Sequence, residues 1–212
     1  MTTAPTLLVI RGNSASGKTT AAREARRRAG RGTALIEQDY FRRVVLREHG
    51  GIGADAVAPG FVNMCVRHLL GAGYHVIVEG ILHSGSYGPM LRQLIAEHPG
   101  PSHAFYLDVG FEETVRRHHN RAEPIPVTAE QMREWYTEHD VLGVDGELVI
   151  PQTATLEQAV ATILDTSGLA GRAPLTPCPV HCLRCAAKQA TSGTTPAAPT
   201  GCHDEAMRGE AR

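Results

Sequence analysis

The sequence predicts an α/β protein of three layers, in which helices cover both faces of a five-stranded parallel sheet. Two observations carry this prediction. Short, nearly continuous apolar segments alternate with helical patterns along the chain, which is typical of strands buried on both faces. The turn signals that close hairpins between antiparallel strands are scarce.

The predicted elements alternate from the N-terminus onward. The expected strands are short and rich in aliphatic residues, and they cover Thr6–Ile10, Thr33–Ile36, His75–Val78, Ala104–Leu107 and Glu147–Ile150. The spacing of apolar residues between and after them predicts helices over 19–29, 40–48, 60–70, 86–97, 111–121, 128–138 and 155–165. This alternation is the pattern of strands joined by crossover helices.

The charge of the chain is nearly balanced, with 21 Lys+Arg against 22 Asp+Glu. This balance argues against a dedicated nucleic-acid binder and against a polybasic membrane anchor. No apolar segment approaches the roughly 18 to 20 residues that a membrane-spanning helix needs, and the N-terminus lacks the basic region of a secretory signal. We therefore expect a cytoplasmic protein without a membrane partner, whose oligomeric state the sequence leaves open.

The composition changes near Gly168. Every aromatic residue lies at or before Tyr136, and the chain from Gly171 onward is rich in Ala, Pro, Thr and Gly. Such a segment buries too little apolar surface to offset the entropy of ordering it. The sequence predicts a folded domain over residues 1–168 and a largely disordered tail over 169–212.

Four of the five cysteines lie in this tail, at Cys178, Cys182, Cys185 and Cys202. A disulfide framework would distribute its cysteines differently, because only Cys65 lies in the body of the chain. Three of these thiolates and one further Cys or His could bind Zn²⁺ tetrahedrally and order the tail. Their spacing is irregular beside known zinc modules, so a disordered tail of free thiols is the favoured interpretation.

Residues 12–19 match the phosphate-binding pattern G-x-x-x-x-G-K-[ST]. The loop follows the first predicted strand directly and leads into the first predicted helix, which is the context this pattern requires. Backbone N–H groups and the helix N-terminus would surround the phosphates, Lys18 would reach the β- and γ-phosphates, and the Thr19 hydroxyl would bind Mg²⁺. The predicted nucleotide-binding residues are Gly12, Asn13, Ser14, Ala15, Ser16, Gly17, Lys18, Thr19 and Thr20.

Kinases, GTPases and motor ATPases all use such a loop. The chain contains no Asn-Lys-x-Asp motif for reading guanine, which argues against a GTPase. The predicted domain also lacks the length and the sensor elements of oligomeric AAA-type machines. A small phosphotransferase with ATP and Mg²⁺ is therefore favoured, and GTP is the alternative donor.

An acidic residue follows the second predicted strand. Ligands of open parallel sheets bind at the carboxyl ends of the strands, so Asp39 is expected beside the phosphate-binding loop. Its carboxylate would accept the proton of an acceptor hydroxyl, while Arg42 and Arg43 would hold the acceptor. The alternative is a structural role for Asp39 as the N-cap of helix 40–48.

The third predicted strand also ends in an acid, Glu79, which is how a carboxylate is presented to Mg²⁺ and the substrate. The alternative is an acid that only ends the strand. The polar loop that follows contains His83 and Tyr87, which we expect to line an acceptor pocket if the loop is more than an ordinary turn.

Arginines gather near the end of the predicted helix 111–121. Arg117 and Arg121 are four residues apart and would share one face of this helix. On a lid they would neutralise charge on the transferring phosphoryl group. The alternative is a solvated helix end.

Four segments together resemble the P-loop kinases of small molecules: GNSASGKTT at 12–20, EQDYFRR at 37–43, VIVEG at 76–80 and RHHNR at 117–121. The chain is similar to chloramphenicol phosphotransferases, zeta-toxin-like kinases and the kinase domains of polynucleotide kinases. The resemblance implies the nucleoside-kinase-like P-loop NTPase fold with strand order 2-3-1-4-5. It also implies that Asp39 is the general base and that Arg117 and Arg121 are the lid arginines.

The sequence thus predicts an ATP- and Mg²⁺-dependent phosphotransferase that transfers the γ-phosphoryl group to a hydroxyl of a small molecule. The likeness to chloramphenicol kinases points to an antibiotic or nucleoside-type acceptor, and hence to antibiotic resistance. Two alternatives stay open. One is a polynucleotide 5′-hydroxyl or sugar-nucleotide kinase, and the other is a nucleotide-binding regulatory protein with little transfer activity.

Overall fold

The computed structural model describes residues 4–49, 56–121 and 125–175. Residues Met1–Ala173 form one compact unit, and Leu169 is buried in its core. The cysteines proposed for Zn²⁺ (Cys178, Cys182, Cys185 and Cys202) and the predicted disordered tail from residue 176 onward lie outside the described residues.

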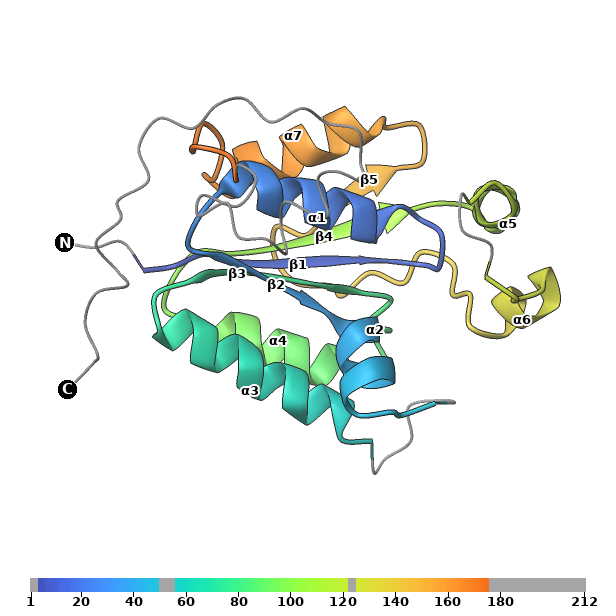
Figure 1. The fold of residues 1–212 in the computed structure, drawn as a ribbon, viewed down its shortest axis with the longest axis horizontal. Coiled ribbons are helices and arrows are strands. Elements are labelled where there is room, and N and C mark those ends of the chain that lie inside the picture. The colour runs from blue at the N-terminus through green and yellow to red at the C-terminus, as the bar shows by residue number, and fades with distance from the viewer. Residues whose placement is uncertain (1–3, 50–55, 122–124, 176–212) are drawn as a thin grey trace, which may run out of the picture. The chain divides into compact units, whose positions relative to one another are not determined.

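A five-stranded sheet forms the centre of this unit, in the order β2-β3-β1-β4-β5 (Figure 1). All neighbouring strands are parallel. The predicted fold class and the predicted strand order are therefore confirmed. The strands are β1 (Leu7–Gly12), β2 (Thr33–Glu37), β3 (His75–Gly80), β4 (Ser102–Asp108) and β5 (Leu148–Pro151).

Helices pack on both faces of the sheet and complete the three layers (Figure 1). One face is covered by α1 (Lys18–Ala29) and α7 (Leu156–Thr166), and the other by α3 (Ala58–Gly71) and α4 (Gly88–Glu97). Side chains of β1 alternate between the two cores: Leu8 and Ile10 pack towards α1 and α7, whereas Leu7 and Val9 pack towards α3 and α4. Burial on both faces explains why this strand is apolar at successive positions.

Two predicted helices take a different form in the structure. The helix expected over 40–48 is a short α2 (Gln38–Tyr40) that continues as a π-helical turn, η1 (Phe41–Val45). The helix expected over 128–138 is only α6 (Ala129–Glu134), which begins with a capping box between Thr128 and Gln131. It ends early because tertiary hydrogen bonds use the next residues: Thr137 N–H donates to the Asn13 side chain over 3.2 Å, and the Tyr136 hydroxyl donates to the Val109 carbonyl over 3.2 Å.

The remaining helix, α5 (Phe111–His119), ends two residues before the predicted end at Arg121. The apolar patterns nevertheless predicted every strand of the sheet and the helices that cover it. Within the described part of the chain, no helix has the length and apolar character to cross a membrane.

Candidate active site

The phosphate-binding loop joins the end of β1 to the start of α1. Gly12 has φ +153°, and a Cβ atom at this position would lie only 2.8 Å from the Leu107 carbonyl oxygen, so the loop needs glycine here. Gly17 has φ +93° and precedes the first residue of α1. Ala15 also has a positive φ, of +60°, which is uncommon for a residue with a side chain. The loop therefore has a curled backbone, the kind that can present N–H groups to an anion, and the Ser16 N–H donates within it to the Asn13 carbonyl over 3.1 Å.

Lys18 is buried at the N-terminus of α1. Its Nζ donates a hydrogen bond to the Asn13 carbonyl oxygen over 3.2 Å, so the ammonium bends back over the loop. Burial lowers the pKa of Lys18, and the negative charges of Glu79 and Asp39 oppose this shift. The ammonium thus contacts the loop and feels the charge of two carboxylates, Glu79 near the end of β3 and Asp39 after β2.

Glu79 and Thr19 face each other across the base of the loop. The Thr19 hydroxyl donates to Glu79 Oε2 over 3.1 Å. Glu79 is almost fully buried, and burial raises its pKa, while Lys18 and the Thr19 hydrogen bond act in the opposite direction. A hydroxyl oxygen and a carboxylate oxygen at this spacing are suitable ligands for Mg²⁺. This ion binds few protein groups and several water or phosphate oxygens.

Asp39 lies inside α2, so the alternative in which it caps helix 40–48 is wrong. The N-cap of α2 is Glu37, without a hydrogen bond from its side chain. The Asp39 side chain is 59 % exposed, and its Oδ1 is 3.5 Å from Arg43 Nε. Its charge acts on both Lys18 and Glu79. Asp39 therefore combines solvent access with an electrostatic effect on Lys18.

The other residues predicted to bind the acceptor divide into buried and exposed groups. Arg42 and Tyr87 are buried, and the Tyr87 hydroxyl accepts a hydrogen bond from Gln38 Nε2 over 3.1 Å. Burial raises the pKa of Tyr87, and the Gln38 hydrogen bond partly offsets it. Arg43 is exposed beside Asp39, and His83 is 31 % exposed in the loop after β3.

Arg117 bridges the phosphate-binding loop and the loop after β5. Its guanidinium donates to the Ser16 carbonyl over 3.1 Å, to the Gln152 carbonyl over 3.2 Å and to Glu113 Oε1 over 2.7 Å. Arg121 lies beyond the end of α5, so the expectation that Arg117 and Arg121 share a helix face is wrong. Its positive charge still lowers the pKa of Lys18. This effect is smaller than the effects of burial and of the two carboxylates. Tertiary structure thus directs Arg117 onto the loop.

A cavity of about 200 Å³ opens beside the phosphate-binding loop. Ser16, Gly17, Thr20 and Arg117 line one part of it. The rest of the wall is largely apolar and comes from β4, β5, α7 and nearby residues: Ala21, Leu107, Val109, Ile150, Pro151, Gln152, Ala154, Thr155, Leu156 and Ala159. Its walls and position suit a flat, mostly apolar group attached to phosphates.

The Asn13 side chain makes hydrogen bonds to parts of the fold outside the loop. Its Nδ2 donates to the Thr137 carbonyl over 2.8 Å and to the Tyr106 hydroxyl over 3.2 Å. The Asn13 side chain therefore holds the loop against the segment after α6. Only the backbone N–H of Asn13 is left to bind a phosphate. Ser14 is half-buried in the loop, and Thr20 is exposed.

Sequence reasoning missed Arg11, which precedes the loop and is fully buried. Its Nη2 donates to Asp140 Oδ2 over 2.7 Å, its Nε donates to the Leu82 carbonyl over 2.9 Å, and Nη1 lies 3.6 Å from Glu147 Oε1. Burial lowers the pKa of Arg11, against the effect of both carboxylates. The signal available in the sequence was an arginine inside an otherwise apolar strand.

The described residues contain no group of three or more His, Cys, Asp or Glu side chains that could hold a metal ion by themselves. A metal at Thr19 and Glu79 would therefore need further oxygen ligands from phosphates or water, which is the usual arrangement for Mg²⁺.

The chain is similar in fold to several solved structures. A sugar kinase from Janibacter sp. HTCC2649 is 22 % identical with a TM-score of 0.61, and the match covers 79 % of this chain and 99 % of that one. The APS kinase of Mycobacterium tuberculosis, solved in complex with AMPPNP and APS, is 15 % identical with a TM-score of 0.60 over 77 % of this chain and 97 % of its own. A gluconokinase from Sinorhizobium meliloti 1021 is 18 % identical with a TM-score of 0.58 over 78 % and 95 %.

A search of curated proteins found no match. A family model described as an AAA domain matches residues 7–142, which is well over half of the chain and runs from the start of β1 past α6. The expectation that the domain does not form an oligomeric AAA-type machine stays a prediction. The chain belongs to this AAA domain family of P-loop proteins.

Proposed function

We propose that this protein is a P-loop kinase that transfers the γ-phosphoryl group of ATP to a hydroxyl of a small molecule. One observation carries the proposal. The buried Lys18 ammonium lies within the electrostatic reach of two carboxylates, the buried Glu79 and the exposed Asp39. A buried acid suits a metal ligand, whereas an exposed acid beside it suits a proton acceptor for an incoming hydroxyl.

Phosphate binding is the task of the loop in this proposal. The backbone N–H groups of residues 12–19 and the Lys18 ammonium hold the β- and γ-phosphates. Thr19 and Glu79 would hold Mg²⁺, directly or through water, and the ion would neutralise charge on the phosphate oxygens. The base and ribose of ATP would occupy the cavity between Arg117 and the loop after β5.

Transfer begins when the acceptor hydroxyl approaches the γ-phosphorus from the side of Asp39. Its oxygen forms the new bond to phosphorus as the bond to the β–γ bridging oxygen of ATP breaks, and ADP leaves. Asp39 takes the hydroxyl proton, and Arg117 and Arg121 stabilise the charge on the transferring group. Arg42 and Arg43 would hold the acceptor beside α2.

The names of the similar structures support a small-molecule acceptor, because they include a sugar kinase, a gluconokinase and an APS kinase. Antibiotics and nucleosides remain in the acceptor class that we propose. A polynucleotide 5′-hydroxyl or sugar-nucleotide kinase and a regulatory nucleotide-binding protein are the competing functions. We assign the activity to residues 1–168 and expect the tail to be dispensable.

A mass-spectrometric screen tests the proposed reaction. The full chain would be incubated with ATP, Mg²⁺ and pooled sugars, sugar acids, nucleosides, sugar nucleotides and antibiotics including chloramphenicol. We expect at least one compound to gain about 80 Da, the mass of a transferred phosphoryl group. ATP binding without any product across the panel would favour the regulatory function, and labelling of 5′-hydroxyl oligonucleotides alone would favour a polynucleotide kinase.

Replacement of Arg117 by glutamine tests the assignment of the nucleotide site. Loss of the guanidinium removes hydrogen bonds to both loops that flank the cavity, so we expect about 10-fold weaker ATP binding and a transfer rate lower by about 100-fold. Arg116→Gln is the matched control, because Arg116 pairs with the same Glu113 but is 64 % exposed. Equal effects of the two substitutions on calorimetric affinity and on transfer would contradict the assignment.

A further inference from the structure

A network around Asp140 joins the loop after β3 to the strand that leads into the phosphate-binding loop. Asp140 accepts hydrogen bonds from Arg11 and from the Ser84 backbone N–H, over 2.7 and 3.0 Å, and from the Ser84 hydroxyl. Arg11 also donates to the carbonyl of Leu82. Both neighbours of His83 are therefore held by hydrogen bonds, Leu82 by Arg11 and Ser84 by Asp140.

The backbone is strained at the two positions that lead into this network. Leu82, immediately before His83, has φ +44°, and His139, immediately before Asp140, has φ +47°. Left-handed conformations are unfavourable for residues with a side chain, and they persist where the surrounding structure enforces them, often at functional sites. Among the described residues the other two of this kind are Ala15, in the phosphate-binding loop, and Arg47.

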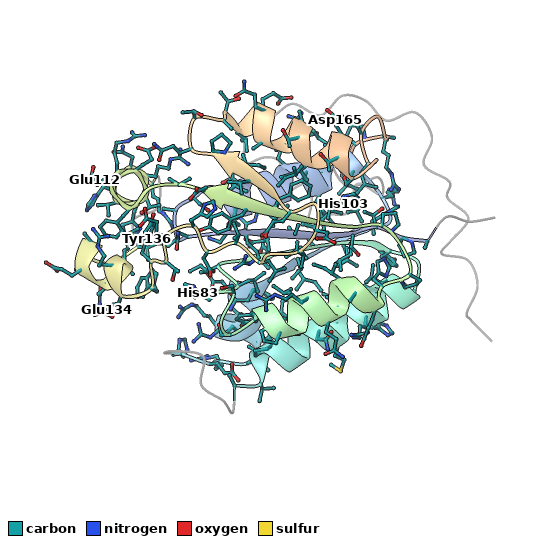
Figure 2. The ribbon with its side chains drawn as sticks, turned by 180° about the vertical axis from the view of Figure 1, so that it is seen from behind. His83, His103, Glu112, Glu134, Tyr136 and Asp165 are labelled. Atoms are coloured by element: carbon teal, nitrogen blue, oxygen red, sulfur yellow. The ribbon has the colours of Figure 1, made fainter. Side chains whose placement is uncertain are left out.

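His83 itself lies at the end of the sheet where ligands of this fold bind. It follows β3 as Asp39 follows β2, and these strands are parallel neighbours, so both residues lie at the same edge. Figure 2 shows His83 towards the end of the sheet that also carries Glu112 and Tyr136, with His103 towards the opposite end. The close packing of Gly80 on Gln38, where an added Cβ would come within 2.8 Å, keeps the loop after β3 against α2.

The imidazole of His83 has a defined orientation relative to Asp140. Its Nδ1 lies 3.7 Å from Asp140 Oδ2, and its side chain is 31 % exposed against 10 % for Asp140. The other ring nitrogen, Nε2, has no hydrogen-bond partner among the described residues. One nitrogen thus faces the carboxylate, and the other is left for a ligand.

Asp140 is charged in the folded protein. Burial by itself raises its pKa, but contacts with His83 and Ser84 and the charge of Arg11 outweigh burial and lower the pKa to about 2. A carboxylate near one imidazole nitrogen favours a proton on that nitrogen. The neutral ring then has a hydrogen-bond acceptor at its other nitrogen.

We propose that Asp140 is a positioning residue that keeps the proton of neutral His83 on Nδ1, so that Nε2 accepts a hydrogen bond from a hydroxyl group of the acceptor. The inference rests on the proposed kinase function and extends it. It gives the acceptor a second hydroxyl contact besides Asp39, and it favours a compound that carries more than one hydroxyl group.

The tautomer of His83 tests the positioning role without any substrate. We would record histidine ¹⁵N NMR spectra of the full chain at alkaline pH, where imidazole side chains are neutral, and assign His83 by the signals lost in His83→Gln. We expect the Nδ1-protonated form in the wild type and a shift towards the Nε2-protonated form in Asp140→Asn. An Nε2-protonated ring in the wild type would overturn the proposal, and this measurement holds even if Asp140→Asn fails to fold.

Steady-state kinetics test the contact with the acceptor. With a compound phosphorylated in the panel described above, we expect His83→Ala to raise the KM for that compound about 3- to 10-fold, the loss of one hydrogen bond. His83→Gln, whose amide oxygen can accept the same bond, should recover most of this loss. His68→Ala is the matched control, because His68 is exposed on α3. An unchanged KM in His83→Ala would overturn the contact.

The two proposals fail in different ways. If no compound in the panel is phosphorylated, the proposed function fails and the acceptor contact of His83 fails with it, while the NMR result still decides whether Asp140 sets the tautomer. If a compound is phosphorylated but His83→Ala behaves like His68→Ala, only the further inference is overturned.

Discussion

Asp39→Asn is expected to reduce phosphoryl transfer by about 10²- to 10⁴-fold, the usual contribution of a general base. Asparagine has nearly the same size but cannot accept the proton that the acceptor hydroxyl loses. ATP binding should remain close to that of the wild type, because the loop backbone, Lys18 and Thr19 are unchanged. Removal of one negative charge near Lys18 acts in favour of the phosphates, so any change in affinity should be a gain. Single-turnover transfer and calorimetric ATP titration measure the two quantities separately.

Asp165→Asn provides the control for this substitution. Asp165 is an exposed aspartate of α7, on the face of the sheet opposite α3 and α4 (Figures 1 and 2). The substitution Asp165→Asn removes one negative charge from the surface without altering the candidate site. Transfer by Asp39→Asn within about tenfold of this control would be too fast for loss of a general base and would reassign the proton to another group.

Arg11→Met is expected to lower the free energy of unfolding by about 3–5 kcal/mol, the cost of removing one partner from a buried ion pair. Methionine fills part of the same space but leaves the carboxylate of Asp140 without its guanidinium. It also removes the cation near Glu147 and the hydrogen bond to the Leu82 carbonyl. Urea unfolding followed by circular dichroism gives the difference from the wild type.

The pH dependence of the unfolding free energy tests whether the carboxylate of Asp140 causes the destabilisation of Arg11→Met. The folded-state pKa of Asp140 is lowered from 3.8 to about 2, so its stabilising contribution is complete above pH 3.8 and is lost as the pH falls through 2. The difference between Arg11→Met and wild type should therefore be largest near neutral pH and shrink below pH 3.8. Arg67→Met is the control, because the Arg67–Glu97 pair is 40 % and 48 % exposed and should contribute at most about 1 kcal/mol. A pH-independent difference would show that packing, and not the ion pair, is lost.

The fold was predictable because its signals are local. Each strand of the parallel sheet is a short apolar segment, and each covering helix repeats its apolar residues on one side. The prediction was weaker where tertiary hydrogen bonds override local preference. The segment after Glu134 has a helical pattern, but Thr137 binds Asn13, which lies 124 residues earlier.

The residues of the candidate site also fall into those that the sequence identifies and those that only the tertiary structure brings together. By itself the sequence determined the strand order through its family resemblance. It also identified the phosphate-binding loop, the acids at the ends of β2 and β3, and the arginines of the α5 region. These depend on residues close together in the chain or on the rule that parallel strands present their carboxyl ends to ligands.

Only the tertiary structure decided which of these groups meet. It brings Thr19 to Glu79 across 60 residues, Arg117 to Ser16 across 101 residues and Arg11 to Asp140 across 129 residues. It also uses the Asn13 side chain as a fastening and places Asp140 beside His83. Contacts of this kind depend on packing the whole sheet, because a buried charge is stable only where the fold supplies its partner, and no spacing in the sequence specifies that partner.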